Sequence, residues 1–99
     1  MHRLTIQYDT PVDPETFDRQ YFEQHVPLCR PLPGLVAMSF SKPRALGPGK
    51  APYLVAELDF ADGETLKAAM RSSEMAAVAE DAQTLHAERV MFTGEVRGG

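Results

Sequence analysis

Apolar and polar residues alternate along four segments of the chain, with the period of a β-strand that has one buried face. The segments are residues 4–8, 35–41, 53–60 and 88–96. On each segment one set of side chains is apolar, and we assign these sets to the covered side of a sheet. They are Leu4, Ile6 and Tyr8, then Val36, Met38 and Phe40, then Leu54, Ala56, Leu58 and Phe60, and finally Val90, Phe92 and Val96.

A first helix is predicted between the first two strands. Asp13 offers a capping oxygen, and Pro14 suits the first helical position. Pro27 lacks a backbone donor and disfavours helical backbone at Val26, so we expect the helix to break near His25.

A second helical region follows the third strand. Asp62 can cap a helix over residues 63–70, and Ser73 can cap a continuation to about Leu85. We therefore expect two segments with a joint at residues 72–73.

The resulting element order is β, α, β, β, α, β, which is typical of a ferredoxin-like α+β fold. Such a fold has a four-stranded antiparallel sheet with its helices on one face. A turn at residues 32–34 and a Pro- and Gly-rich loop over residues 43–52 connect the elements. A chain of 10.9 kDa is the size of one domain, so residues 1–99 are expected to form a single domain.

The other face of the sheet is left bare by this arrangement. We assign to it Thr5, Gln7, Ser39, Ser41, Tyr53, Val55, Glu57, Arg89, Met91 and Thr93. This set is too polar for a dry core, and too apolar in places for ordinary surface. We expect two subunits to bring these faces together around a pocket, and an ordinary solvated sheet face is the alternative.

Composition narrows the classes of function. The chain has 14 acidic against 10 basic residues, which gives no electrostatic basis for binding nucleic acid. It has no long apolar run, so neither a membrane span nor a signal peptide is expected. Cys29 is the only cysteine, which excludes an internal disulfide and favours a reducing cytoplasm.

Residues 17–28, Phe-Asp-Arg-Gln-Tyr-Phe-Glu-Gln-His-Val-Pro-Leu, and residues 32–35, Leu-Pro-Gly-Leu, resemble the signature of the EthD family. The resemblance extends to the Pro-rich loop, to residues 57–60, to Asp81 and to residues 92–96. It implies a dimeric α+β barrel, in which two ferredoxin-like subunits pair through their sheets and each encloses a small-molecule pocket.

Relatives of this barrel include lactone isomerases, polyketide cyclases and cofactor-free monooxygenases, so the fold does not decide the activity. Many family members carry two adjacent histidines where this chain has Gln24 and His25. Only the second position carries over, and a mechanism that needs both imidazoles is not implied here.

His25 is the candidate catalytic residue, because an imidazole can accept or donate a proton near neutral pH. The alternative is that His25 only caps the end of the helix. Tyr21 lies one helical turn earlier and could orient the imidazole or a bound carbonyl, or simply pack in the core.

Tyr53, Glu57 and Arg89 are predicted to share the open face, where they would bring a phenol, an acid and a base to one cavity. A salt bridge between Glu57 and Arg89 at a dimer seam is the alternative. We take these three residues and Tyr21 as candidate substrate-binding residues.

The remaining chemical groups carry weaker signals. Asp81 could pair with a basic side chain, although an acid in mid-helix is usually solvated. Cys29 is expected to be an inert buried thiol. His2 and His86 have no partners at metal-ligand spacing, and no nucleotide or flavin fingerprint occurs, so neither a metal nor a cofactor is expected.

The sequence therefore favours a small homodimer that binds a compact, partly apolar organic molecule. It would catalyse a cofactor-independent proton transfer, such as isomerisation or cyclisation, with His25 as general acid or base. One alternative is a non-catalytic accessory or ligand-carrying dimer in a catabolic pathway. Another is a cofactor-free monooxygenase that acts on activated aromatic compounds.

Overall fold

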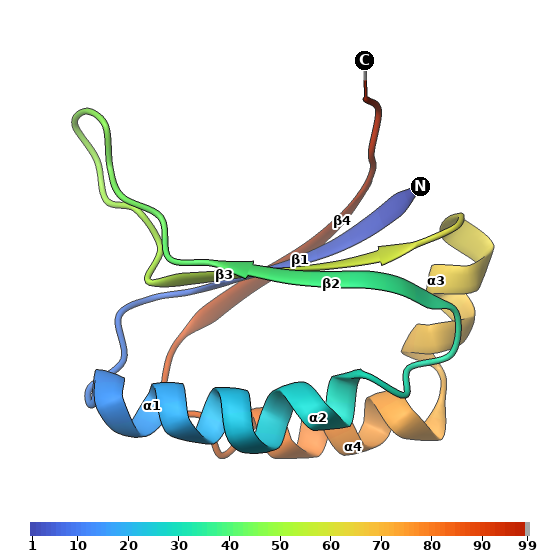
Figure 1. Ribbon diagram of the computed structural model, residues 1–99, viewed down its shortest axis with the longest axis horizontal. Helices are drawn as coiled ribbons and strands as arrows, with labels where there is room; N and C mark the ends of the chain where they lie inside the picture. The colour runs from blue at the N-terminus through green and yellow to red at the C-terminus, as the bar shows by residue number, and fades with distance from the viewer. Residues whose placement is uncertain (99) are drawn as a thin grey trace.

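Four antiparallel strands form one sheet in the order β2-β3-β1-β4 (Figure 1). The computed structural model describes residues 1–98. The strands are β1 His2–Tyr8, β2 Leu35–Ser41, β3 Leu54–Phe60 and β4 Arg89–Glu95. The helices are α1 Pro14–Gln20, η1 Tyr21–His25, α2 Val26–Cys29, α3 Gly63–Met70 and α4 Ser73–Ala82. This order confirms the predicted ferredoxin-like α+β fold.

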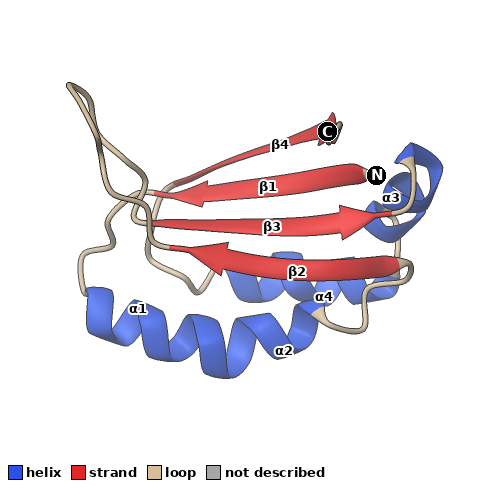
Figure 2. Ribbon diagram, turned by 45° about the horizontal axis from the view of Figure 1, so that its top comes forward, coloured by secondary structure: helices blue, strands red, loops and turns tan. Residues whose placement is uncertain are grey.

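The helices cover one face of the sheet and leave the other bare, as predicted (Figure 2). Helices α1, η1, α2 and α4 form a layer below the sheet, and α3 lies at one end of it (Figure 1). The core lies between this layer and the sheet, where Tyr21, Leu54 and Phe60 are the largest fully buried side chains. No helix within residues 1–98 has the length and apolar character needed to cross a bilayer.

The first helix begins as predicted but does not break near His25. Asp13 caps it, with Oδ1 accepting from the backbone N–H of Thr16 at 3.2 Å. The helix then widens into the π-helical turn η1 and continues to Cys29. A proline ring in a helix clashes with the carbonyl four residues before it, and a π turn moves that carbonyl aside. We attribute the continuation past Pro27 to this wider turn.

The second helical region is divided at the predicted joint. Asp62 caps α3 by accepting from the backbone N–H of Thr65 at 2.8 Å. The cap of α4 is Ser72 rather than the predicted Ser73, because the Ser72 hydroxyl accepts from the backbone N–H of Met75. The helix ends at Ala82, three residues before the predicted limit.

Strand β4 faces the opposite way from the prediction. Arg89 pairs with Tyr8 and Met91 pairs with Ile6 across the ladder. Because directly opposed residues of an antiparallel pair share a face, Arg89 and Met91 point toward the helices. Val90 and Phe92 consequently lie on the open face, where they are 61% and 47% exposed.

Two further placements differ from the alternation in the sequence. A register shift between Leu35 and Ala37 places a bulge at Val36, whose side chain is exposed rather than covered. Tyr53 precedes β3, and its hydroxyl donates to Oδ1 of Asp18 on α1 at 2.9 Å. Tyr53 therefore reaches the helix layer and does not belong to the open face.

Candidate functional site

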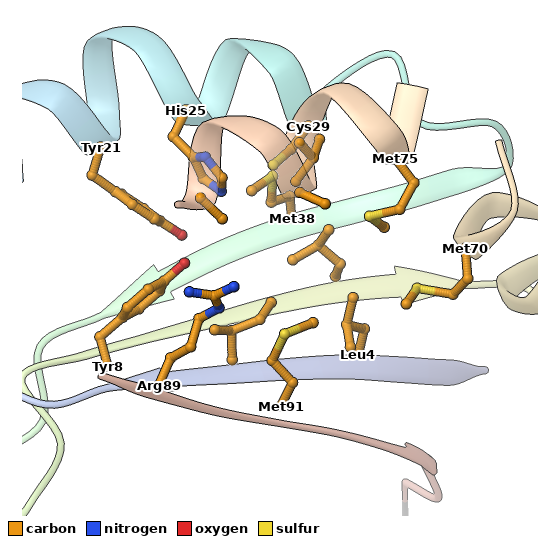
Figure 3. A pocket seen from close by; sticks show the side chains of 15 residues that line it. Leu4, Tyr8, Tyr21, His25, Cys29, Met38, Met70, Met75, Arg89 and Met91 are labelled. Carbon is orange, nitrogen blue, oxygen red and sulfur yellow. The ribbon is translucent and has the colours of Figure 1, made fainter. Parts of the chain in front are cut away.

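A cavity of about 280 Å³ lies between the sheet and the helix layer (Figure 3). Its walls are mostly apolar, and its few polar groups come from Tyr8, Tyr21, His25, Cys29 and Arg89. The apolar lining comprises Leu4, Ile6, Met38, Leu58, Met70, Met75, Val78, Ala79, Ala82 and Met91. The cavity is thus on the covered side of the sheet. The pocket expected between the open faces of two subunits would need a second chain, and it stays a prediction.

His25 forms a buried hydrogen-bonded pair with Asp81. The imidazole Nδ1 lies 2.8 Å from Oδ2 of Asp81, and the two side chains are only 5% and 7% exposed. An ionised carboxylate can only accept hydrogen bonds, so we place the shared proton on Nδ1. In the neutral form of the ring Nε2 then has a free lone pair, and the ring projects into the cavity (Figure 3). This is the arrangement of a general base that is oriented by a carboxylate.

Asp81 is not among the predicted site residues, although pairing with a basic side chain was one of the alternatives for it. It is buried on α4, so the expectation of a solvated acid is wrong. The signal was present in the spacing, because Val78, Ala82 and Leu85 place Asp81 on the apolar stripe of its helix. A carboxylate on such a stripe needs buried partners.

Gln24 supplies the second partner of Asp81. Its side-chain Nε2 donates to Oδ1 of the carboxylate at 2.5 Å, while Oδ2 is taken by His25. The amide therefore fixes the carboxylate from outside the cavity. Its role is that of a support for the histidine pair, and it does not line the cavity.

The π turn places the side chains of Tyr21 and His25 on the same side of the helix. Both residues lie in η1, and their rings stack with centroids 5.3 Å apart and planes inclined by 30°. Isolated π turns are frequent at functional sites because they change which side chains of a helix share a face. Here both rings line the cavity.

The hydroxyl groups of Tyr8 and Tyr21 face each other at the polar end of the cavity (Figure 3). Burial raises the pKa of Tyr8 to about 12, although the nearby Arg89 guanidinium acts in the opposite direction. Burial also raises the pKa of Tyr21 well above its ordinary value. Both phenols are therefore protonated donors at neutral pH.

Arg89 lies beside Tyr8 and reaches the same polar end (Figure 3). It comes from the edge strand β4, where the residue remains exposed to solvent. No carboxylate within residues 1–98 forms an ion pair with its guanidinium. The cavity thus carries an uncompensated positive charge at its mouth.

The structure does not bring Tyr53 and Glu57 to this cavity. Glu57 lies on the open face and pairs with Arg3 at 3.4 Å, so the suggested salt bridge with Arg89 is wrong. Tyr53 is bound to Asp18 and Lys42 at the end of the sheet. Of the five predicted site residues, the cavity joins His25, Tyr21 and Arg89.

Cys29 lies deeper in the wall, next to the histidine pair. Its side chain is buried, and burial raises the pKa of the thiol to about 11. The thiolate form is therefore rare at neutral pH, which does not suit a nucleophile. In the described part of the chain, no three His, Cys, Asp or Glu side chains form a cluster that could hold a metal ion.

Comparison with known proteins identifies relatives along most of the chain. The EthD domain model matches residues 9–88. An uncharacterized 11.0 kDa protein from the thcB-thcC intergenic region of Rhodococcus erythropolis is 38% identical over 61 residues. That match covers 61% of this chain and 59% of the relative, which is less than two thirds of its length.

Solved structures extend the likeness to the whole fold. An ethyl tert-butyl ether D (EthD) family protein from Bacillus halodurans has a TM-score of 0.88 and 34% identity, and the match covers 98% of this chain and 99% of that one. A dimeric ferredoxin-like protein of unknown function from Thermobifida fusca has a TM-score of 0.70 at 16% identity, with 96% and 90% covered. SnoaB, a cofactor-independent oxygenase from Streptomyces nogalater, has a TM-score of 0.71 at 15% identity, with 99% and 94% covered.

The last two similarities show the fold alone, because their sequence identity is low. The family match is of a different kind, since it spans His25 and Asp81 and is supported by a relative aligned over nearly its full length. The resemblance seen in residues 17–28 is confirmed, and the chain belongs to the EthD domain family.

Proposed function

We propose that this protein binds a compact, largely apolar organic molecule in the cavity and moves a proton on it without a cofactor. His25 is the general base and then the general acid. The observation that carries the proposal is the buried pair of His25 and Asp81 at the wall of an apolar cavity. Such a pair gives a neutral imidazole a fixed orientation toward whatever the cavity holds.

The chemistry follows from the two states of the imidazole. Nε2 takes a proton from an acidic C–H of the bound molecule, and the electron pair of that bond stays on the molecule as a carbanion or enolate. The imidazolium is stabilised meanwhile by the Asp81 carboxylate, 2.8 Å away. Return of the proton to a different carbon isomerises the molecule. Alternatively, the carbanion attacks a carbonyl of the same molecule and closes a ring, the C=O π pair moves onto oxygen, and the resulting alkoxide takes the proton back from Nε2.

The apolar walls support this use of the cavity. Methionine, leucine and valine side chains exclude water and accept varied shapes, because the methionine side chain is flexible. At about 280 Å³ the cavity is near the lower limit for small-molecule sites, which favours a small substrate. Tyr21, stacked on His25, is in position to orient a bound carbonyl.

The proposal is tested in two steps with a panel of small 1,3-dicarbonyl compounds, phenols and lactones. A thermal-shift screen first identifies binders, since a ligand that binds the folded state raises its stability by RT ln(1 + [L]/Kd). Proton NMR in D₂O then follows exchange at the acidic carbon of each binder. We expect His25→Ala to abolish exchange, and His86→Ala, a change to an exposed histidine outside the cavity, to leave it intact. Equal exchange in both variants would refute the role of His25.

Two other functions fit parts of the same site. Cofactor-free oxygenation is supported by the fold that this chain shares with SnoaB, and it would begin with the same deprotonation of an activated aromatic compound. Substrate-dependent uptake of oxygen distinguishes it from isomerisation. A non-catalytic carrier would bind its ligand with no exchange in the native protein, and His25→Ala would then lower stability alone.

We also propose that two copies of the chain pair through the open faces of their sheets. Val90 and Phe92 place exposed apolar side chains on that face, and the half-buried Val55 lies on the same face across Gln7 of β1. The Thermobifida fusca neighbour is described as dimeric. Native mass at micromolar concentration tests this, with Phe92→Asp expected to give monomers. A native protein that is already monomeric would refute the proposal.

A further inference from the structure

We infer that Arg89 and the Tyr8 hydroxyl form a binding site for a negatively charged oxygen, so that the substrate is a carbonyl compound or phenol whose oxygen becomes anionic during the reaction. This inference rests on the proposed function, and it names the class of molecule that the cavity accepts. It also gives separate roles to the two ends of the cavity, with proton transfer at His25 and charge stabilisation at Arg89.

The register of β4 determines on which face of the sheet the positive charge of Arg89 lies. Arg89 is opposite Tyr8 in the ladder, so its side chain leaves the sheet on the helix side and reaches the cavity. Arg89 forms no ion pair within residues 1–98, whereas Arg3, Lys42, Lys67 and Arg97 each pair with a carboxylate. Arg89 thus differs from Arg3 on the opposite face, whose charge is compensated by Asp59 and Glu57.

The tyrosine hydroxyls complete a set of hydrogen-bond donors. Tyr8 and Tyr21 face each other beside the guanidinium (Figure 3). Both phenols keep their protons at neutral pH, since burial raises the pKa of each. A carbonyl oxygen placed there can accept hydrogen bonds from the guanidinium and from a phenol hydroxyl.

The other titratable groups near this point do not compensate the charge. His25 carries no negative charge in either protonation state, and the carboxylate of Asp81 already accepts from His25 and Gln24. The Cys29 thiol is protonated. An anionic oxygen therefore finds one full positive charge and no carboxylate that already pairs with it.

The chemical consequence is that the site matches the charge that appears during proton transfer. When Nε2 of His25 takes a proton from the carbon next to a carbonyl, the C–H electron pair forms a C=C bond and the C=O π pair moves onto oxygen. The enolate oxygen is then bound by Arg89 and Tyr8. The proton returns from Nε2 to carbon and restores the carbonyl, so the step is balanced. Donors aimed at a developing oxyanion are the largest single contribution in many enzymes.

The test uses 4-nitrophenol, whose anion absorbs light at a longer wavelength than the neutral phenol, and nitrobenzene as a neutral probe of similar shape. Absorbance is recorded against pH with the probe free and with the probe saturated by protein. We expect the bound phenol to ionise at a pH at least one unit lower, which is about a tenfold preference for the anion. Arg89→Met should remove this preference, and Arg97→Met, a change at an exposed arginine after β4, should keep it.

The outcomes separate this inference from the proposed function. If 4-nitrophenol binds without a change in its ionisation, or if Arg89→Met retains the preference, the anion site is refuted while ligand binding stands. If nitrobenzene binds and 4-nitrophenol does not, the anion site is again refuted. If neither probe binds to the native protein, the small-molecule cavity fails as well. Because Arg89 is exposed, the Met variant is expected to fold, and its melting temperature verifies this.

Discussion

The pair of His25 and Asp81 makes a quantitative prediction about stability. In Asp81→Ala, Nδ1 of His25 loses its only hydrogen-bond partner within the described residues while it remains almost completely buried. Leaving a buried donor unsatisfied costs about 1–3 kcal/mol. The Gln24 amide is exposed and can bind water instead, so it adds little. We expect a loss of about 2 kcal/mol, which lowers the melting temperature of a domain of this size by roughly 8–16 °C.

The reverse substitution, His25→Phe, preserves an aromatic ring but leaves Oδ2 of the buried carboxylate without its donor. We expect a loss of similar size, about 1–3 kcal/mol. In the double variant neither group is left without a partner, because both polar groups are gone. The double variant should therefore lose clearly less than the sum of the two single variants, with a coupling energy of about 1.5–3 kcal/mol.

Urea unfolding of the four proteins at one protein concentration measures this cycle. The fixed concentration matters because dimerisation makes stability depend on concentration. Glu80→Ala is the control, since it removes an exposed carboxylate from the same helix and should change stability by less than about 0.5 kcal/mol. Additive losses, to within about 0.5 kcal/mol, would show that the two side chains are not coupled and would refute the orientation of His25 by Asp81.

Three further predictions concern the turn, the buried phenol and the thiol. Gly34 has a φ of +78°, and a Cβ there would lie 2.2 Å from Cγ2 of Thr65, so Gly34→Ala should lower the free energy of unfolding by about 1–3 kcal/mol. Its urea midpoint should recover in part when Thr65→Ser removes that methyl group. Because Tyr8 keeps its proton to about pH 12 in the folded state, the native protein should lose stability as pH rises from about 10 to 12, by about 2 kcal/mol, and Tyr8→Phe should lose less. Cys29 should resist iodoacetamide at about pH 8 until urea unfolds the protein, and rapid labelling of the native protein would contradict its burial.

The order of the elements could be predicted from the sequence because each strand and cap is a local pattern. Asp13 and Asp62 cap their helices as expected, and β1 and β3 present the predicted apolar face, as does β2 at Met38 and Phe40 but not at Val36. Strand β4 faces the opposite way, since it is an edge strand whose residues are all exposed in the single chain, so burial does not decide which set faces the helices. Arg89 of β4 faces the helices, and Phe92 lies on the open face. Alternation alone therefore assigned the two sets of side chains on this strand to the wrong faces.

The site could be predicted only in part, because its geometry depends on contacts between distant segments. His25 was recognisable from its neighbours in residues 17–28, and Asp81 required knowledge that α4 packs against η1 and α2. The rule that proline ends a helix was also insufficient at Pro27. A π turn satisfies the same steric constraint without ending the helix, and it directs Tyr21 and His25 into the cavity.

The proposed dimer interface and the proposed anion site both include residues of β4. This edge strand is hydrogen-bonded only to β1, and all of its residues are exposed in the single chain. Its inner side carries Arg89 to the mouth of the cavity, and its outer side carries Val90 and Phe92 to the open face. A second copy that covers the outer side would therefore restrict the strand that positions Arg89. If pairing of the two chains strengthens binding of a ligand to Arg89 in this way, then binding of the ligand must strengthen pairing. Linkage requires the two factors to be equal.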